Sequence, residues 1–256
     1  MTKELSVAVK AAKEAGKIIM KGYGNIGFVR KKNDRLGNVT DIDFKAQEKI
    51  KKIILNAFPD AVILSEEEET HNFSDDMWIV DPLDGTNNFA RGIKYFAVSI
   101  ALMKNKKIVL GVVFDPVNGD LFHAEKGKGS FLNEKKILVS GSLQLENSTI
   151  DIGIHKREGT REKNFALFQK MYQEGSSFKH FGSAALQLSF VAAGWLDAFL
   201  EYGLFSWDVA AGILLVEEAG GKVTDDKSGN FDLFNEGRAI VASNGKIHGQ
   251  ILEALK

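Results

Sequence analysis

Two aspartates stand three positions apart where an apolar run ends. Met77 to Val80 is rich in strand-forming residues, and Asp81 and Asp84 follow it closely. Because Pro82 cannot donate to a sheet ladder, we expect the strand to stop at Asp81 and a turn through Gly85 to lead into a helix. Carboxylates beside the N–H groups of a helix start suit a divalent cation and a phosphate. An isolated pattern of this kind is also typical of an Asp-rich turn that only caps a helix.

Two further carboxylates lie at the expected ends of other elements. Glu66 follows a short β-type run and belongs to an acidic run, which is usually a solvated loop. Asp208 lies in the first turn of an apolar helix, where it would favour the helix dipole, with Ser206 as the expected N-cap. Each position therefore has an ordinary structural explanation when it is taken alone.

Taken together, the four carboxylates require one explanation. If Glu66, Asp81, Asp84 and Asp208 converged without cations, repulsion would raise their pKa values or push the segments apart. Magnesium removes this conflict, because it prefers oxygen ligands and keeps waters for a substrate phosphate. Two such ions, about 4 Å apart, can polarise a phosphoryl group and activate a water. The residues thus predict metal-assisted hydrolysis of a phosphate ester.

The elements that would position these residues alternate between helix and strand. Helices are expected over 3–23, 43–58, 161–172, 183–193, 207–219 and 246–255. Strands are expected at 61–64, 77–80, 95–103, 108–114, 121–124, 137–139, 149–152, 178–181, 196–201 and 239–242, with an antiparallel meander over 95–124. The glycines around Lys128 predict a turn rather than a phosphate loop. The pattern indicates an α/β protein with two sub-domains, 1–145 carrying the main motifs and 146–256 completing a cleft.

Composition excludes several other classes of protein. The 256 residues include 33 basic and 34 acidic ones, for a net charge of −1, without the basic excess that is typical of direct nucleic-acid binding. Cysteine is absent, which excludes thiolate metal sites and a cysteine nucleophile. No apolar stretch approaches the ~20 residues that span a bilayer, and we expect a cytoplasmic protein. The five histidines show no ligand spacing and are expected to pack or lie on the surface: His71, His123, His155, His180 and His248.

Two longer segments resemble the signatures of the inositol monophosphatase family. They are Asp81–Phe89 and Trp207–Gly221, and supporting matches lie at Val39–Asp43, Glu66-Glu67 and Gly182–Ala185, in the order of the family and over nearly the whole chain. The resemblance implies a five-layer αβαβα sandwich, a homodimer and a magnesium-dependent phosphomonoesterase with two to three ions per site. Its substrate would be inositol 1-phosphate or a related small sugar phosphate.

The resemblance also implies the metal ligands. Glu66, Asp81 and the Leu83 carbonyl would hold a first magnesium ion, and Asp81, Asp84 and Asp208 a second. Glu66 would help a weaker third ion through waters. The family often has glycine before its glutamate pair, where this chain has a serine, and different residues in the preceding basic loop at positions 37 and 38. These departures leave third-metal affinity and lithium sensitivity open.

Catalytic and substrate contacts follow from the same resemblance. Thr86, paired with Asp43, would orient the nucleophilic water, and the N–H groups of Gly85 and Thr86 would bind phosphate oxygens. Without the resemblance, Glu201 would be interpreted as a rim carboxylate. The hydroxyls of the substrate would contact Asp84, Ala184 through its backbone, Glu201 and Asp208.

The sequence leaves the substrate and the cellular role open. The same chemistry would serve fructose 1,6-bisphosphate, 3′-phosphoadenosine 5′-phosphate, NADP or histidinol phosphate, although no inserted segment suggests a nucleotide pocket. Bacterial SuhB-type members of the family also act as partners of the transcription antitermination machinery. A binding module without turnover is a third possibility, and the pair formed by Thr86 and Asp43 argues against it.

Overall fold

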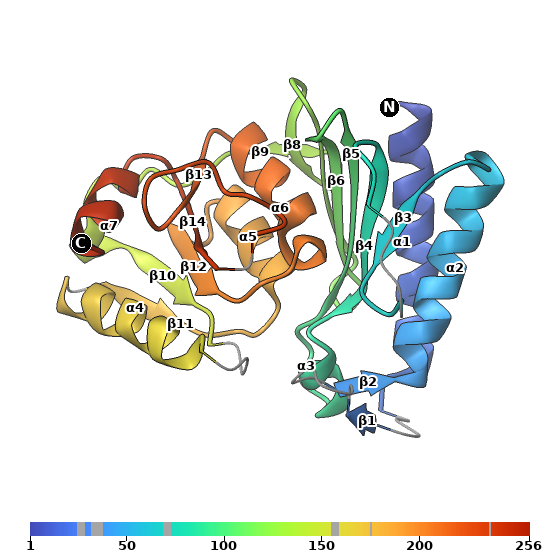
Figure 1. Cartoon of the computed structure of the whole chain (residues 1–256), viewed down its shortest axis with the longest axis horizontal. Helices are drawn as coiled ribbons and strands as arrows, with labels where there is room; N and C mark the ends of the chain where they lie inside the picture. The colour runs from blue at the N-terminus through green and yellow to red at the C-terminus, as the bar shows by residue number, and fades with distance from the viewer. Residues whose placement is uncertain (25–28, 32–37, 69–72, 155–158, 175, 236) are drawn as a thin grey trace.

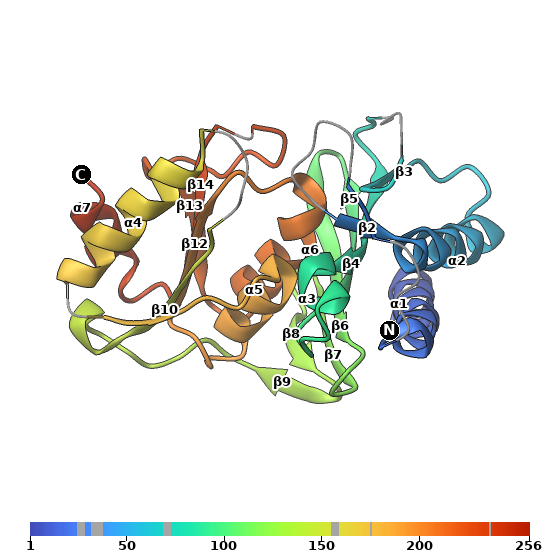
Figure 2. The same cartoon turned by 90° about the horizontal axis from the view of Figure 1, so that it is seen from below.

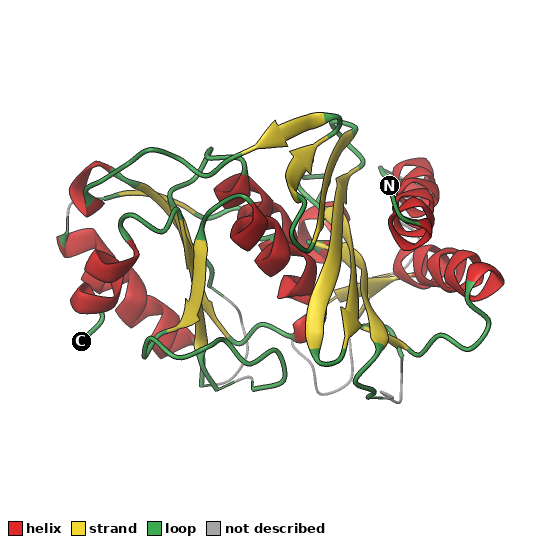
Figure 3. Ribbon diagram, turned by 90° about the horizontal axis from the view of Figure 1, so that it is seen from above, coloured by secondary structure: helices red, strands yellow, loops and turns green. Residues whose placement is uncertain are grey.

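The computed structural model describes residues 1–24, 29–31, 38–68, 73–154, 159–174, 176–235 and 237–256. In this part of the chain, helices and sheets alternate in five layers (Figure 1). The outermost layers are helical, the larger β-sheets lie inside them, and further helices separate these sheets (Figures 2 and 3). The expected αβαβα sandwich is therefore confirmed. Position 37 of the basic loop, Glu69, His71 and His155 lie outside the described residues.

Seven strands build the first sheet, in the order β3-β4-β5-β6-β7-β8-β9. β3 runs parallel to β4 and the following pairs are antiparallel, which confirms the predicted meander. The strands are β3 (Ile63–Ser65), β4 (Met77–Asp84), β5 (Ala97–Lys104), β6 (Lys107–Asp115), β7 (Asp120–Glu125), β8 (Gly129–Leu132) and β9 (Lys135–Ile137).

Both faces of this sheet are covered by helices. Side chains alternate across a strand, and in β4 Trp78 and Val80 pack with helices α1 (Lys3–Gly22) and α2 (Asp41–Ala57). Met77 and Ile79 point the other way and pack with the inner helices α5 (Ala184–Ala192) and α6 (Ser206–Glu218). A strand buried on both faces explains the continuous apolar run before the aspartates.

Five strands build the second sheet, in the order β11-β10-β12-β14-β13. Phe199 faces the inner helices, whereas Ala198 and Leu200 face the outer helices α4 (Arg161–Gln173) and α7 (His248–Ala254). The strands are β10 (Thr149–Ile152), β11 (Ser177–Lys179), β12 (Ala198–Tyr202), β13 (Lys222–Asp225) and β14 (Ala239–Ser243). The sequence did not predict β13, because this short edge strand is only partly buried and carries charges at both ends.

The remaining elements are short. A two-stranded antiparallel ribbon pairs β1 (Val29–Lys31) with β2 (Asn38–Thr40), and α3 (Thr86–Ala90) follows β4. A 3-10 turn, η1 (Leu145–Asn147), stands where the second half begins. The division at residue 145 stays a prediction. No helix within the described ranges has the length and apolarity needed to cross a bilayer.

Candidate active site

One extra residue in β4 brings the two aspartates of the central motif to the same face of the sheet. Asp81 pairs with Ser99 and Asp84 with Ala97, so three steps along β4 match two along β5. Ser99 and Ala97 share one face, and their partners therefore share it too, whereas an unbroken strand would point Asp81 and Asp84 apart. The prediction that the strand ends at Asp81 is wrong, because this bulge accommodates Pro82 outside the regular pairing.

The shared face is the one that the inner helices cover. The hydroxyl of Ser99 lies 3.3 Å from the backbone carbonyl oxygen of Trp207, at the start of α6. Ala97 belongs to the apolar cluster that includes α5 and α6. Asp81, which is opposite Ser99, consequently points toward the first turn of α6. Its Oδ1 accepts a hydrogen bond of 2.9 Å from the N–H of Leu83.

Asp208 lies in that first turn. Its Oδ2 accepts a 2.7 Å hydrogen bond from the N–H of Phe205, which is the residue that caps α6. Ser206 is the first residue inside the helix, so its predicted role as N-cap is wrong. The carboxylate of Asp208 binds the cap residue, and this leaves no need for a serine hydroxyl there.

Asp84 joins β4 to the inner helix α5. Its Oδ2 accepts hydrogen bonds of 2.6 Å from the Ser183 hydroxyl and 2.7 Å from the Ala185 N–H. Burial, together with the charge of Glu66, raises the pKa of Asp84 to about 6 against the opposing effect of these hydrogen bonds. Two carboxylates that disfavour each other's charge are stabilised by a cation between them.

Gln47, on the buried face of α2, holds the turn that carries Glu66. Its Oε1 accepts a hydrogen bond of 2.5 Å from the Ser65 hydroxyl and one of 3.1 Å from the N–H of Glu67. The N–H of Glu66 lies 3.3 Å from the carbonyl oxygen of Val80, so Glu66 follows β3 beside the end of β4. Gln47 was not among the predicted site residues, although a polar residue four positions after Asp43 on an otherwise apolar helix face is a usable signal.

The acidic run after β3 separates into different environments. Glu68 forms an ion pair of 2.6 Å with Lys51 of α2. Glu66, in contrast, is close enough to Asp84 for its charge to shift the pKa of that residue. The interpretation of the run as a solvated loop is therefore incomplete for Glu66.

The turn after β4 directs Thr86 toward α2. Gly85 has φ of 88°, and a Cβ there would lie 3.0 Å from the carbonyl oxygen of Tyr95, so this position requires glycine. The Thr86 hydroxyl lies 3.0 Å from Oδ1 of the fully buried Asp43 and 2.9 Å from the Leu83 carbonyl oxygen. Because a hydroxyl has one proton, Thr86 donates to one acceptor at a time and keeps lone pairs for a water.

Glu201 occupies the inner face of the second sheet. It follows Leu200, which faces outward, and alternation places the Glu201 side chain on the same face as Phe199. Only 6% of Glu201 is exposed, which differs from the solvent-exposed rim carboxylate considered as the alternative. Ala184, the other substrate-contact candidate, is buried at the first position of α5.

A buried carboxylate outside the predicted site residues supports α5 from the second sheet. Oδ1 of Asp151, in β10, accepts a hydrogen bond from the Gln187 side chain. Its Oδ2 has no hydrogen-bond partner among the described residues, and the same holds for the hydroxyl of Tyr95, whose ring stacks on Phe181 at 4.9 Å. Burial raises the pKa of Asp151 to about 7. The start of α5 is thus held by Asp84 and by Asp151.

Two polar residues of the signature segments bind backbone groups. The Asn88 amide donates a hydrogen bond of 2.8 Å to the carbonyl oxygen of Phe181. The Glu218 carboxylate accepts a hydrogen bond of 2.8 Å from the N–H of Gly127 and one of 2.9 Å from the N–H of Gly129. These glycines form a turn between β7 and β8, as predicted, and the turn is anchored to the end of α6.

The described histidines contact backbone carbonyl or hydroxyl oxygens. His123 contacts the carbonyl oxygen of Asn133 and His180 that of Ile152, at 3.0 and 3.1 Å. His248 is buried, with its two ring nitrogens each 2.9 Å from a hydroxyl, on β13 and β14. Burial lowers the pKa of His248 to about 4. Their predicted packing role agrees with these contacts.

The donors of the candidate site suit magnesium. Within the described ranges, no three His, Asp or Glu side chains are gathered closely enough to enclose an ion. Magnesium keeps several of its waters and does not need a preformed protein cage, so carboxylates that would share an ion need not be gathered before it binds. The candidate ligands are all oxygen atoms, from Glu66, Asp81, Leu83, Asp84 and Asp208.

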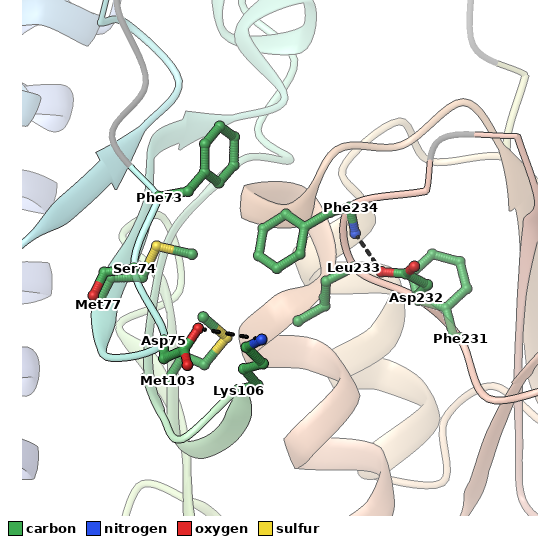
Figure 4. Close-up of a pocket in the computed structure, with 10 residues that line it drawn as sticks. All are labelled: Phe73, Ser74, Asp75, Met77, Met103, Lys106, Phe231, Asp232, Leu233 and Phe234. Atoms are coloured by element: carbon green, nitrogen blue, oxygen red, sulfur yellow. Dashed lines mark hydrogen bonds and ion pairs between the residues drawn. The ribbon is translucent and has the colours of Figure 1, made fainter.

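A cavity of about 440 Å³ lies apart from these residues. Met77, at the opposite end of β4 from Asp84, lines it together with Met103. Figure 4 shows Phe73 and Phe234 facing each other there, with ring centroids 5.5 Å apart. Its lining includes none of the predicted site residues, so the cavity is a separate feature. Residues from both the first and the second half of the chain line it.

Comparisons with known proteins match the whole chain. The family model described as Inositol monophosphatase family covers residues 1–256. The Nus factor SuhB of Pasteurella multocida is 36% identical, covering 100% of this chain and 97% of that protein. The inositol-1-monophosphatase of Mesorhizobium japonicum is 38% identical, with coverages of 98% and 96%. The crystal structure of extragenic suppressor protein SuhB from Bartonella henselae superposes with a TM-score of 0.92 at 40% identity, with coverages of 100% and 99%.

Proposed function

Because this chain belongs to the inositol monophosphatase family, we propose that it hydrolyses inositol 1-phosphate or a related small sugar phosphate with magnesium. The family makes the chain a phosphatase, and the metal and the substrate are the proposed part. One observation carries the proposal: the bulge in β4 points Asp81 and Asp84 to the same face, against the helices that carry Ser183 and Asp208. Both halves of the chain therefore contribute to one site.

The metal would be held by oxygen donors on four segments. A first ion would use Glu66, Asp81 and the Leu83 carbonyl, and a second would use Asp81, Asp84 and Asp208. The raised pKa of Asp84, which comes from burial and from the charge of Glu66, supports a cation there. When bound, magnesium supplies charge for the phosphoryl oxygens and acidifies a water.

Thr86 and Asp43 would orient that water. The Thr86 hydroxyl lies within hydrogen-bond distance of Oδ1 of Asp43, so it can pass its own proton to the carboxylate while its lone pair accepts a proton from the water. The fully buried Asp43 stays fixed by α2. The N–H groups of Gly85 and Thr86, at the start of α3, would bind phosphate oxygens, because the first N–H groups of a helix have no intrahelical acceptor.

The alcohol of the substrate would lie toward the second sheet. Glu201 faces the inner layer, and a buried carboxylate there would accept hydrogen bonds from the hydroxyl groups of a sugar or inositol. Asp84, Asp208 and the backbone of Ala184 would complete the contacts. The alternatives of fructose 1,6-bisphosphate, NADP and 3′-phosphoadenosine 5′-phosphate use the same chemistry.

The direct test is phosphate release by the purified protein, with magnesium and after chelation. The substrates are inositol 1-phosphate, fructose 1,6-bisphosphate, NADP and 3′-phosphoadenosine 5′-phosphate. We expect turnover that requires magnesium, is highest with inositol 1-phosphate and is lost in Asp84→Asn. The matched control is Asp60→Asn, which changes an exposed aspartate at the far end of α2. Calorimetric titration of magnesium into each protein separates loss of the metal from loss of chemistry. Turnover that persists after chelation would overturn the proposal.

A second role follows from the name of a relative. The Pasteurella multocida protein is named as a Nus factor, and this chain could act likewise as a partner of the transcription machinery through protein contacts. In cells that depend on such a role, we expect Asp84→Asn to complement as well as the unchanged protein. Failure of that variant to complement, at equal abundance, would contradict a role independent of catalysis. The homodimer and the cytoplasmic location stay predictions of the resemblance.

A further inference from the structure

Gly153 is the residue against which the Glu201 carboxylate rests. Gly153 follows β10 and donates its N–H to the carbonyl oxygen of Leu200, 3.0 Å away, so it lies beside Glu201 on the neighbouring strand. A Cβ built on Gly153 would stand 1.7 Å from Oε2 of Glu201, 2.0 Å from Cδ and 2.6 Å from Oε1. The space that any other side chain would use at position 153 is thus filled by the carboxylate.

We propose that Gly153 is a positioning residue that determines the selectivity of this enzyme for phosphate esters of polyhydroxylated alcohols. The inference rests on the proposed function, because it assumes that Glu201 accepts substrate hydroxyls. Gly153 allows the carboxylate to lie flat against β10. With a side chain at that position, Glu201 must turn away, and the hydroxyls lose an acceptor placed for them.

The physical circumstances make this position unusually informative. Gly153 does not have a positive φ, so its backbone lies outside the left-handed region that disfavours alanine. The three atoms nearest to that Cβ all belong to the end of the Glu201 side chain, which can rotate, rather than to a rigid backbone segment. Gly153→Ala therefore displaces one carboxylate with little effect on the fold.

The effect should appear as a change of selectivity. We would measure kcat/KM with magnesium for inositol 1-phosphate and for phenyl phosphate, whose alcohol carries no further hydroxyl. In Gly153→Ala we expect the ratio of the two values to fall roughly tenfold to a hundredfold, the range for losing a hydrogen bond to a charged group. The loss should lie mainly in KM for inositol 1-phosphate, because the reacting phosphate remains bound by other residues.

Two further variants make the result specific. Gly249→Ala, at an exposed glycine whose added Cβ meets nothing within 4 Å, is the matched control and should leave the ratio at the wild-type value. Glu201→Ala should lower the ratio as Gly153→Ala does. In the double variant, the glycine substitution should add less than about a twofold change, since it acts through a carboxylate that is no longer present.

The possible outcomes are distinct. A folded Gly153→Ala protein whose ratio stays within twofold of wild type overturns the inference, and so does an equal loss on both substrates, which would indicate a general structural role. An effect of Gly153→Ala that persists undiminished without the Glu201 carboxylate also overturns it. If the wild-type protein hydrolyses neither substrate, the proposed function fails and this inference fails with it.

Discussion

The buried Asp151 gives the stability of this protein a pH dependence opposite to ordinary acid denaturation. Burial raises its pKa from 3.8 to about 7 in the folded chain. As pH rises through this window, the unfolded chain releases a proton that the folded chain keeps, and the release favours the unfolded state. Stability is therefore lost with rising pH. The difference between the two pKa values corresponds to about 4 kcal/mol between pH 4 and pH 8.

The substitution Asp151→Asn removes this titration and keeps an acceptor for Gln187. Measured by urea denaturation at constant ionic strength, the variant should gain up to about 4 kcal/mol relative to wild type as the pH is raised from 4 to 8. Other groups titrate equally in both proteins and cancel in the difference. Asp60→Asn, at an exposed site, should show a pH-independent difference. If the difference for Asp151→Asn is equally flat, the carboxyl is ionised at neutral pH and the reasoning is refuted.

Three further predictions follow. Burial lowers the pKa of His248 from 6.5 to about 4, so on acidification the unfolded chain binds a proton before the folded chain does. Stability should therefore fall by about 3 kcal/mol as the pH is lowered from 6.5 to 4. His248→Gln should flatten that part of the urea-denaturation profile, and an unchanged slope contradicts the assignment. Ser65→Ala removes the hydrogen bond to Gln47 and should cost about 1 kcal/mol in the free energy of unfolding; calorimetry should also show weaker magnesium binding, and an unchanged affinity would mean that this bond does not position Glu66. Thr86→Val should lower kcat by at least about 100-fold while magnesium still binds, and turnover within tenfold of wild type would remove Thr86 from the mechanism.

Most of the fold could be predicted because its long elements carry strong periodicity. The helical spacing over residues 3–23 corresponds to α1, and the apolar runs over 95–124 correspond to β5, β6 and β7. The failures lie where a tertiary contact decides the outcome. A proline argues against a strand, and only the pairing of β4 with β5 shows that a bulge accommodates Pro82. Likewise, β13 exists because β14 offers it a partner.

Candidate site residues could be predicted where the residue type itself suggests metal or phosphate binding. They were harder to predict where the role of a residue depends on its contacts in the folded chain. Two aspartates beside a glycine turn predict metal and phosphate binding once Glu66 and Asp208 are considered with them. In contrast, the need for glycine at position 153 depends on a carboxylate 48 residues later in the chain, on another strand. Gln47 stands between these cases, because its place on the buried face of α2 could have been read from helical spacing.

The inner helices α5 and α6 have a consequence for how the molecule unfolds. They pack on both sheets through one apolar cluster, which contains Ile79 of the first sheet and Phe199 of the second. Separating either sheet from these two helices exposes part of the shared cluster to water, which costs hydrophobic stabilisation. Both sheets therefore belong to a single cooperative unit, and slowly exchanging amide hydrogens of β4 and β12 should report the same opening free energy. We therefore expect the cluster between the two sheets to open only with global unfolding.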